Sequence, residues 1–276
     1  MHFGFFSIGW YAVMYLVGFL VILGLLRKRL KKGEGQMHMT KEQLLDFLLI
    51  CFLGAVIGGR LGYVLFYNLP FYLAHPLAII SPLDPETGAL VGIYGMSYHG
   101  GLVGALYAVM VFVKKYNLDF WALVDFVIPA IPAGYFFGRL GNFLNGELYG
   151  RATDSWLGMY FPNDSFGFLR HPSQLYEAFL EGLVLFVIFW LGRNQRNWQG
   201  KFLALYFIAY AVARFVGEFF REPDLQIGFV HWCTDAKFCL PTGQAGVSTL
   251  GQLFSLAMFF IGGGMLFWKK RKTMLQ

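Results

Sequence analysis

Apolar residues are grouped along this chain into seven long stretches separated by polar segments. The stretches lie at about 10–26, 44–67, 95–113, 120–140, 173–191, 201–220 and 251–268. A helix rises about 1.5 Å per residue, so each stretch can cross a hydrocarbon core about 30 Å thick when tilt and interfacial ends are included. The pattern predicts an all-α integral membrane protein with seven transmembrane helices.

Composition supports this prediction. Apolar residues make up 57% of the 276 residues and charged residues 14%, and the mean hydropathy is +0.53. Soluble domains carry about 25% charged residues, so a soluble fold is excluded. The first stretch is followed by RKRLKK and has no basic segment before it, which is typical of a retained span rather than a cleaved signal. We expect residues 1–276 to form one transmembrane domain.

The basic residues predict the orientation. Of 22 Lys and Arg residues, 15 fall in segments 27–43, 114–119, 192–201 and 269–276, and four fall in the other connecting segments. Cytoplasmic loops of membrane proteins are enriched in Lys and Arg, so the N-terminus is predicted outside and the C-terminus inside. The net charge of +6 therefore reads as a topology signal, and we expect no nucleic-acid partner.

Glycine and proline positions predict how the helices pack. Gly54, Gly58 and Gly62 repeat every four residues, which gives a small-residue face for close helix approach. Pro129 and Pro132 should kink the fourth helix and expose carbonyls that need other partners. Residues 68–92 are predicted as an outer arm, and residues 152–172 and 221–250 as outer loops.

Unusual polar side chains fall in the outer halves of the predicted helices. They are Tyr11, Tyr15, Arg60, His99, Arg139, Glu177, Glu181, Tyr210, Arg214 and Glu218. Charged groups inside a bilayer are costly unless they are partnered, so they mark candidate functional sites. We expect these side chains to converge on one outward-facing cavity.

The densest polar segment is residues 138–151, GRLGNFLNGELYGR, which we call the signature. It places Arg139, Asn142, Asn145 and Glu147 among glycines that let a backbone and a ligand come close. The asparagines could bind a lipid headgroup or satisfy helix-end carbonyls. Glu147 could counter Arg139 or Arg151.

Tyr210, Arg214 and Glu218 lie one turn apart along one helix. The arginine and the glutamate could form an internal salt bridge or part of an anion site. With Arg60 and Arg139 near the same membrane face, only one or two carboxylates would be placed to neutralise three arginines. This reasoning predicts surplus positive charge, and a guanidinium fork suits a phosphate.

Other candidates stay open. His99, in YGMSYHGGL, could be structural, a base or a phosphate contact. Ser173 is a candidate N-cap for the fifth helix, and Glu177 with Glu181 could organise the cavity floor. No metal-ligand cluster is expected. Cys233 and Cys239 can form a disulfide only if their loop faces an oxidising compartment.

Five sequence blocks resemble one known family. The signature GRLGNFLNGELYGR resembles that of bacterial phosphatidylglycerol–prolipoprotein diacylglyceryl transferases. GGRLGYVLFY, YGMSYHGGL, RHPSQLYEA and YAVARFVGEFFREPD are similar to further blocks of that family, and the resemblance extends from about Phe6 to Trp268. The N-terminus, the compact loop after the fourth helix and residues 232–246 depart from the family pattern.

The resemblance implies a reaction and a place in the cell. These enzymes transfer a diacylglyceryl group from phosphatidylglycerol to the lipobox cysteine of a prolipoprotein signal peptide, in the bacterial cytoplasmic membrane and near its outer leaflet. By motif position it implies catalytic roles for His99, Arg139, Arg214, Glu218 and Tyr11. It implies lipid-binding roles for Arg60, Arg139, Asn142, Asn145, Glu147, Gly150, Tyr210 and Arg214.

The implied chemistry needs a thiolate, a glycerol carbon and a phosphate leaving group, and no cofactor or metal. We expect Arg139 and Arg214 to hold the phosphate, while His99 and Glu218 are alternative proton acceptors. A transporter or channel for an anionic lipid could use the same arginines without chemistry. A non-catalytic lipid-binding scaffold would leave His99, Arg139 and Glu218 with little purpose.

Overall fold

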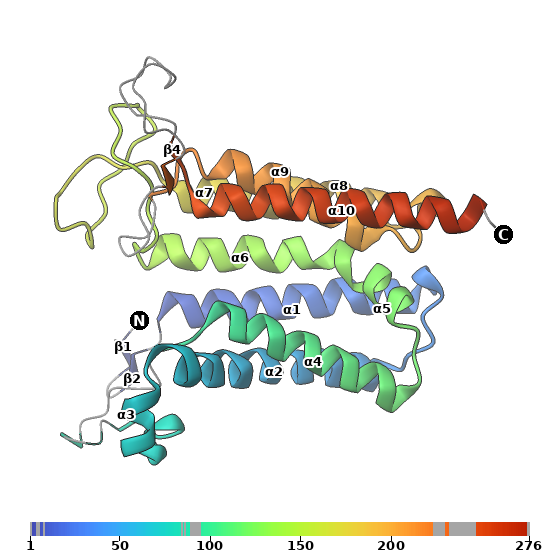
Figure 1. The fold of residues 1–276 in the computed structure, drawn as a ribbon, viewed down its shortest axis with the longest axis horizontal. Helices are drawn as coiled ribbons and strands as arrows, with labels where there is room; N and C mark the ends of the chain where they lie inside the picture. The colour runs from blue at the N-terminus through green and yellow to red at the C-terminus, as the bar shows by residue number, and fades with distance from the viewer. Residues whose placement is uncertain are drawn as a thin grey trace. The chain divides into compact units, whose positions relative to one another are not determined.

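The structure, a computed structural model, describes most of the chain (Figure 1). The described residues are 2–3, 6–7, 9–83, 85, 87–88, 95–222, 230–231 and 247–274. The chain divides into two units, of which the first joins Met1–Met37 with Val124–Gln276 and the second is His38–Leu123. Cys233 and Cys239, the candidate disulfide pair, lie outside the described residues.

The regular secondary structure described in the first unit is mainly helical, with two antiparallel pairs of two-residue strands. The elements are β1 (His2–Phe3), β2 (Phe6–Ser7), α1 (Trp10–Lys31), η1 (Glu34–Gln36), α5 (Phe120–Val127), η3 (Ile128–Ala130), α6 (Ile131–Leu144), α7 (Ser173–Glu177), η4 (Ala178–Val184), α8 (Leu185–Gly192), η5 (Arg196–Trp198), α9 (Phe202–Gly217), β3 (Val230–His231), β4 (Val247–Ser248) and α10 (Leu250–Met274). α5 crosses from the second unit into the first. His2 pairs with Ser7, and Val230 pairs with Ser248.

The predicted fourth span is interrupted at its prolines. Between α5 and α6 lies a 3-10 turn, Ile128–Ala130. Pro129 has no N–H to bond the carbonyl of Asp125, four residues earlier. Arg29 of α1 takes that role, because its Nη1 donates to the Asp125 carbonyl at 3.3 Å and to the Phe126 carbonyl at 2.5 Å. The kink was predicted at this place, and the structure has a 3-10 turn there whose freed carbonyls find another partner, as expected.

The predicted fifth span is helical from end to end but contains a π-helical turn. α7 passes into this turn, η4, which passes into α8. Gly182 lies in the turn, and a Cβ there would lie 2.7 Å from the Cβ of Phe136 in α6. The glycine therefore lets η4 and α6 approach closely. π-Helical turns are rare and occur frequently at functional sites.

Several helix ends that carry candidate polar residues lie at the same end of the first unit. Figure 1 shows the starts of α1, α7 and α10 at the same end of the unit as the ends of α6 and α9. Ile128, Leu185, Phe189 and Phe202 form a buried core between η3, α8 and α9. This core fixes the helices whose ends carry the candidate polar residues.

The opposite end of this unit is tied by Arg29, Glu34 and Arg193, which we call the Glu34 cluster. The Glu34 carboxylate pairs with Nε of Arg29 at 3.3 Å and with Nε of Arg193 at 2.9 Å. Burial favours protonation of Glu34, but the hydrogen bond from Arg193 and the charges of both arginines hold its pKa below the ordinary value. Two basic segments predicted to be cytoplasmic, 27–43 and 192–201, therefore meet here.

The second unit is built on one close helix pair. Its elements are α2 (Lys41–Tyr67), α3 (Leu69–Ala74), η2 (Pro76–Ile79) and α4 (Tyr98–Tyr116). A Cβ on Gly54 would lie 2.6 Å from the Gly104 carbonyl oxygen, and one on Gly62 would lie 2.8 Å from the Cα of Gly100. A Cβ on Gly58 would collide with the Gly100 carbonyl oxygen. The predicted small-residue face of α2 is confirmed.

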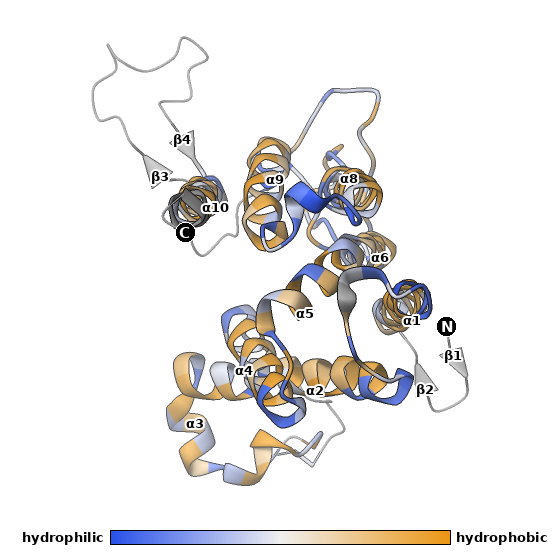
Figure 2. Ribbon diagram, turned by 90° about the vertical axis from the view of Figure 1, so that its right-hand side faces the viewer, coloured by the Kyte–Doolittle hydropathy of each residue, from blue (hydrophilic) through white to orange (hydrophobic). Residues whose placement is uncertain are grey.

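Five predicted spans are confirmed as helices long and apolar enough to cross a membrane. They are Trp10–Lys31, Lys41–Tyr67, Phe120–Leu144, Ser173–Gly192 and Leu250–Trp268. The other two predicted spans are also helical, but α9 is shorter, with 16 residues, and α4 begins with Tyr-His-Gly-Gly and ends with Lys-Lys-Tyr. Figure 2 shows hydrophobic residues along most of α2, α8 and α9. These helices are those expected of an integral membrane protein.

Candidate functional site

The polar residues of the signature form one hydrogen-bonded chain. Arg139 and Asn142 lie on α6, which ends before Asn145. Arg139 Nη1 donates to Oδ1 of Asn142 at 3.4 Å, and Asn142 Nδ2 donates to Oε1 of Glu147 at 3.1 Å. Asn145 Nδ2 donates to the same glutamate oxygen at 3.5 Å. The signature therefore links α6 to the turn that follows it.

Arg139 is held by α7 as well as by its own helix. Its Nε lies 2.9 Å from Oε2 of Glu177 and 2.8 Å from the hydroxyl oxygen of Tyr135, one turn earlier on α6. The guanidinium carbon also lies 5.0 Å from the centre of the Tyr135 ring. Cation–π contact and ion pairing act together here. Arg139 thus pairs with Glu177, and the glutamate of its own signature bonds to the asparagines.

Arg214 lies at the centre of the carboxylates. Its Nη1 is 2.9 Å from Oε1 of Glu177 and 3.5 Å from Oε1 of Glu181, and its Nη2 pairs closely with Oε1 of Glu218. Glu177 therefore bridges Arg139 and Arg214 through its two carboxylate oxygens. Nη1 of Arg221 lies 3.7 Å from Oε1 of Glu177.

These side chains form what we call the Glu177 cluster. Its members are Arg139, Arg214, Arg221, Glu177, Glu181 and Glu218. Three glutamates contact Arg139 and Arg214, so the expectation that only one or two carboxylates are placed to neutralise the arginines is wrong. The sequence shows which residues share a helix face, but it does not show that α7 and η4 carry two glutamates onto the arginines of α6 and α9.

Tyr135 bonds to the cluster, and Tyr210 packs against Tyr135. The Tyr135 hydroxyl donates to Oε2 of Glu181 at 2.5 Å while it accepts from Arg139. The rings of Tyr135 and Tyr210 lie edge to face, with centroids 6.0 Å apart. Tyr210 was predicted from its position one turn before Arg214. Tyr135 was not predicted, although it stands one turn before Arg139 in the same way.

Tyr11 of α1 reaches the signature through a glycine. A Cβ on Gly141 would lie 3.2 Å from Cδ2 of Tyr11. The hydroxyl oxygens of Tyr11 and Tyr15 are 2.7 Å apart. The structure thus brings Tyr11 against α6, as the prediction of one polar site requires, and its contact with substrate stays a prediction.

The end of the signature is fixed by backbone contacts. The Gly150 N–H donates to the His171 carbonyl at 2.8 Å, and a Cβ on Gly150 would collide with the Phe220 carbonyl oxygen. Arg151 donates from Nε to the Arg221 carbonyl at 2.9 Å and from Nη2 to the Glu218 carbonyl at 3.3 Å. Glycine is needed at position 150 because two neighbouring chain segments touch it.

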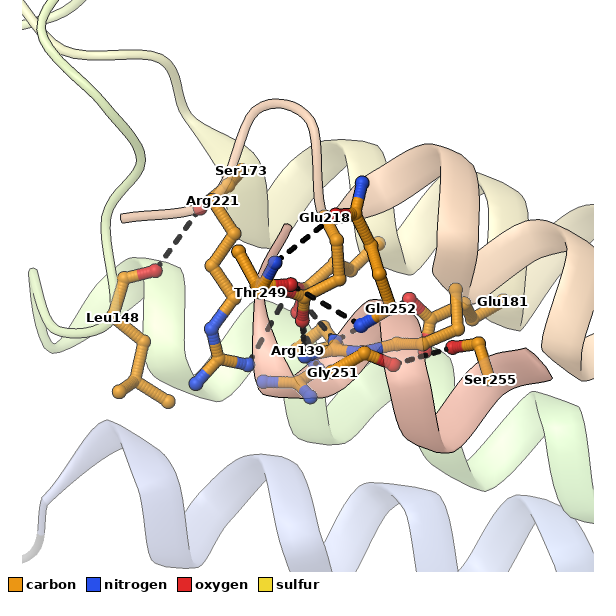
Figure 3. A network of polar contacts seen from close by, with 12 residues as sticks. Arg139, Leu148, Ser173, Glu181, Glu218, Arg221, Thr249, Gly251, Gln252 and Ser255 are labelled. Carbon is orange, nitrogen blue, oxygen red and sulfur yellow. Dashed lines mark hydrogen bonds and ion pairs between the residues drawn. The ribbon is translucent and has the colours of Figure 1, made fainter. Parts of the chain in front are cut away.

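The predicted N-cap role of Ser173 is wrong. Pro172 takes the N-cap position of α7, and no side chain caps that helix. The Ser173 hydroxyl donates to the Leu148 carbonyl at 3.1 Å instead (Figure 3). Gln174 Nε2 donates to the Glu147 carbonyl at 2.7 Å. Both side chains therefore hold the turn of the signature, and Leu148 takes a positive φ of 58° there.

The loop between α6 and α7 is braced by Arg170. Its Nε and Nη2 donate to the two carboxylate oxygens of Asp164 at 2.8 and 3.1 Å, and its guanidinium carbon lies 5.1 Å from the centre of the Tyr149 ring. The hydrogen bond from Arg170 holds the pKa of Asp164 below its ordinary value. Burial lowers the pKa of His171, which favours a neutral ring. Through Arg170, this loop packs against Tyr149, which belongs to the signature.

A hollow of about 190 Å³ lies beside Asn145. Its lining includes Gly146, Tyr160, Phe161 and Asn163. The arginines of the Glu177 cluster do not line it, so the charged site and this hollow are separate features.

Arg60 and His99 belong to the second unit. Arg60 donates to the carbonyls of Ile79 at 2.8 Å, Ala78 at 2.7 Å and Gly95 at 3.2 Å, and its guanidinium carbon lies 5.0 Å from the centre of the Tyr72 ring. His99 is exposed at the start of α4. The convergence of Arg60 and His99 with the Glu177 cluster stays a prediction.

The comparison with known proteins covers nearly the whole chain. A profile of the prolipoprotein diacylglyceryl transferase family matches residues 1–268. The chain belongs to this family. The phosphatidylglycerol–prolipoprotein diacylglyceryl transferase of Chlorobaculum tepidum is 44% identical over 269 residues, which cover 97% of this chain and 88% of that protein.

Proteins of the same name from two Campylobacter species are also similar. The Campylobacter curvus protein is 43% identical over 263 residues, covering 95% of this chain and 88% of its own length. The Campylobacter jejuni protein is 42% identical over 255 residues, covering 92% and 86%. The resemblance inferred from the five sequence blocks is confirmed.

Within this diacylglyceryl transferase chain, sequence reasoning did not predict three residues that contact or adjoin the cluster: Arg221, Thr249 and Gly251. Arg221 lies four residues after the last residue of α9, and Thr249 and Gly251 lie at the start of α10, next to Glu218. Their signal was slight: a threonine and a glycine before an apolar helix in the segment TLGQ. Threonine at such a position predicts a helix cap and gives no hint of the partner.

Proposed function

We propose that this chain transfers the diacylglyceryl group of phosphatidylglycerol to the lipobox cysteine of a prolipoprotein signal peptide. A thioether forms and glycerol phosphate is released, which is the first step of lipoprotein maturation. One observation carries the proposal: Arg139 and Arg214 hold one carboxylate between them in a chain that matches the family over residues 1–268.

We place the enzyme in a bacterial cytoplasmic membrane with seven spanning helices and the reaction near the outer face. Among the described residues, five helices have the length and apolarity of spans, and α4 and α9 would complete the set of seven. The excess of Lys and Arg in alternate connecting segments supports an outer N-terminus and a cytoplasmic C-terminus. The Glu177 cluster would then lie toward the outer leaflet.

The lipid phosphate is proposed to bind Arg139 and Arg214. Their charges are already matched by glutamates, so a phosphate enters by taking guanidinium N–H groups that now bond to Glu177. Two converging guanidinium groups can bond several phosphate oxygens at once. They also stabilise the charge that grows on the leaving phosphate as its bond to the glycerol carbon breaks.

Sulfur supplies the new bond. The cysteine thiolate attacks the glycerol carbon, the carbon–oxygen bond to the phosphate breaks, and glycerol phosphate leaves with the electron pair. The thiol proton goes to a base, for which Glu218 and His99 are the two candidates. Glu218 is the candidate that contacts Arg214.

The remaining predicted residues surround this step. Asn142, Asn145 and Glu147 form the hydrogen-bonded edge on which the glycerol headgroup is proposed to rest. Tyr11 and Tyr210 bound the site from α1 and α9. Gly150 keeps the backbone of the signature close to residues 171 and 220. Arg60 stays a candidate for lipid binding, although its described donors reach carbonyls.

The direct test is transfer by the purified protein. Phosphatidylglycerol labelled in the diacylglyceryl group is presented in mixed micelles with a peptide that carries a lipobox cysteine. We expect labelled peptide with a thioether and an equal amount of glycerol phosphate, measured by mass spectrometry. Transfer should persist with a chelator, because the proposed step needs no metal.

A matched peptide with serine in place of the lipobox cysteine controls for binding without chemistry. Lipid or anion flux in proteoliposomes with no lipidated peptide would favour a transporter. Saturable binding of both substrates with neither flux nor product would favour a scaffold. Either result would reject the proposed transfer.

A further inference from the structure

Glu218 is held by more than its arginine. It follows the last residue of α9 and is 3% exposed. Its Oε1 pairs with Arg214, whereas its Oε2 accepts a hydrogen bond from the Thr249 hydroxyl at 2.8 Å. The two carboxylate oxygens therefore have different partners, one from α9 and one from the residue that precedes α10.

Thr249 is itself fixed in orientation. Its hydroxyl oxygen accepts from the Gln252 N–H at 3.2 Å, and the Gln252 side-chain oxygen accepts from the Thr249 N–H at 3.0 Å. This is a reciprocal cap at the start of a helix. A hydroxyl has one proton, and because the lone pairs face the Gln252 amide, that proton is left for Glu218. Figure 3 shows Thr249 between Glu218 and Gln252.

Gly251 leaves the space in which the Glu218 carboxylate lies. A Cβ on Gly251 would be 2.5 Å from the carboxyl carbon and from Oε1 of Glu218, and 3.0 Å from Oε2. A methyl group at this position would therefore displace the carboxylate. The start of α10 therefore positions Glu218 in two ways: the Thr249 hydroxyl bonds to it, and the absence of a side chain at Gly251 leaves room for it.

We propose that Thr249 and Gly251 are positioning residues that limit the Glu218–Arg214 pair to one carboxylate oxygen, Oε1. A free carboxylate and a guanidinium favour a two-bond, side-by-side pair. Because Thr249 bonds to Oε2, Glu218 occupies Arg214 through one oxygen only, and the phosphate has to displace fewer carboxylate contacts when it binds. This inference rests on the proposed function, because it assigns Arg214 to phosphate binding.

The test compares three variants of the full-length protein in the transfer assay. Thr249→Val keeps the shape of the side chain and removes the hydroxyl, whereas Thr249→Ser keeps the hydroxyl. Ser255→Ala is the matched control, because Ser255 is a buried residue of α10 whose hydroxyl bonds to the Gly251 carbonyl at 2.7 Å. We expect kcat/KM for phosphatidylglycerol to fall roughly tenfold or more in Thr249→Val, the scale of one bond to a charged group.

Thr249→Ser should restore most of that loss, and Ser255→Ala should keep near wild-type kcat/KM even if its melting temperature falls. Gly251→Ala supplies an independent variant, since it retains the cap and suits a helix better than glycine. It should lose activity to a similar degree. Because both changes act on one carboxylate, the double variant should lose much less than the product of the single losses.

The outcomes separate the two proposals. If wild type forms no lipidated peptide, the proposed function fails. If wild type is active and Thr249→Val and Gly251→Ala match it, the positioning role is overturned. Losses that Ser does not restore, that multiply in the double variant, or that Ser255→Ala shares would also overturn it. If Thr249→Val does not accumulate in the membrane, Gly251→Ala and Thr249→Ser decide the question.

Discussion

The Glu34 and Glu177 clusters both join arginines to glutamates, but their arginines differ in what else they bond. Arg29 in the Glu34 cluster donates to the backbone carbonyls of Asp125 and Phe126, which a proline interruption leaves open. Arg214 in the Glu177 cluster pairs with three carboxylates. A backbone carbonyl is fixed by the fold, whereas a carboxylate contact can be exchanged for a substrate anion. Bonds to backbone carbonyls therefore mark Arg29 as structural, whereas the carboxylate contacts of Arg214 are compatible with a binding role.

The same distinction applies in the second unit. Arg60 resembles Arg29, because its donors reach the carbonyls of Ala78, Ile79 and Gly95. Its role in holding η2 and the segment before α4 follows from these bonds. The sequence analysis counted Arg29 among the basic residues of a predicted cytoplasmic segment, and the family resemblance implied a lipid-binding role for Arg60. A one-dimensional pattern carries no information about bonding partners, so it could not show that both arginines bond to backbone carbonyls.

The largest effect is expected in the Glu177 cluster. Arg139→Ala and Arg214→Ala should each reduce transfer at least about a hundredfold, the scale of losing a preorganised donor to a growing negative charge. Product formation per folded molecule is the measurement. Arg193→Ala, in the Glu34 cluster, is the control and should keep most activity. Full activity in both Arg139→Ala and Arg214→Ala would contradict the claim that the Glu177 cluster binds substrate whereas the Glu34 cluster is structural.

A smaller effect, of a different kind, is expected at Arg60. Arg60→Met should lower the free energy of unfolding by about 1–3 kcal/mol for each buried carbonyl that loses its donor. Transfer per folded molecule should fall far less than in Arg139→Ala. Thermal unfolding in detergent and the transfer assay check the two parts. Lost transfer with unchanged thermal stability would instead assign Arg60 to the lipid phosphate.

The smallest effect is a pH dependence at Glu34. Its pKa is held below the ordinary value of 4.5, so its ion pairs stabilise the fold above that pH and lose this contribution as pH falls through the lowered pKa. Wild type should therefore melt higher than Glu34→Gln near neutral pH, and the gap should narrow in acid. A gap that is constant or grows in acid would contradict this assignment. Transfer at neutral pH should change little in Glu34→Gln.

The helices of this fold could be predicted well because long apolar runs and prolines act locally. The interruption at Pro129 and the glycine face of α2 follow from single residues, and both are found. Five predicted spans are found with the expected length and apolarity, whereas the 16 residues of α9 fall short of that length.

The charge balance of the site could not be predicted from the chain. It depends on which helix lies beside α9, and Glu177 and Glu181 come from a segment 37 and 33 residues before Arg214. Thr249 reaches Glu218 from 31 residues away. Helical periodicity predicts which face of its helix a side chain lies on, but it does not predict which other helix packs against that face. Such contacts can therefore be found only in the tertiary structure.

The wide turn of Ala178–Val184 has a consequence for insertions and deletions. A π turn holds one residue more than an α turn, so removing one residue there can restore regular α-helix while both flanks keep their facing directions. The same deletion within α8 would turn Phe189 by about 100° away from its core neighbours. In this stretch the chain can therefore lose one residue without rotating the flanking helical segments away from their neighbours, although Glu181 would move.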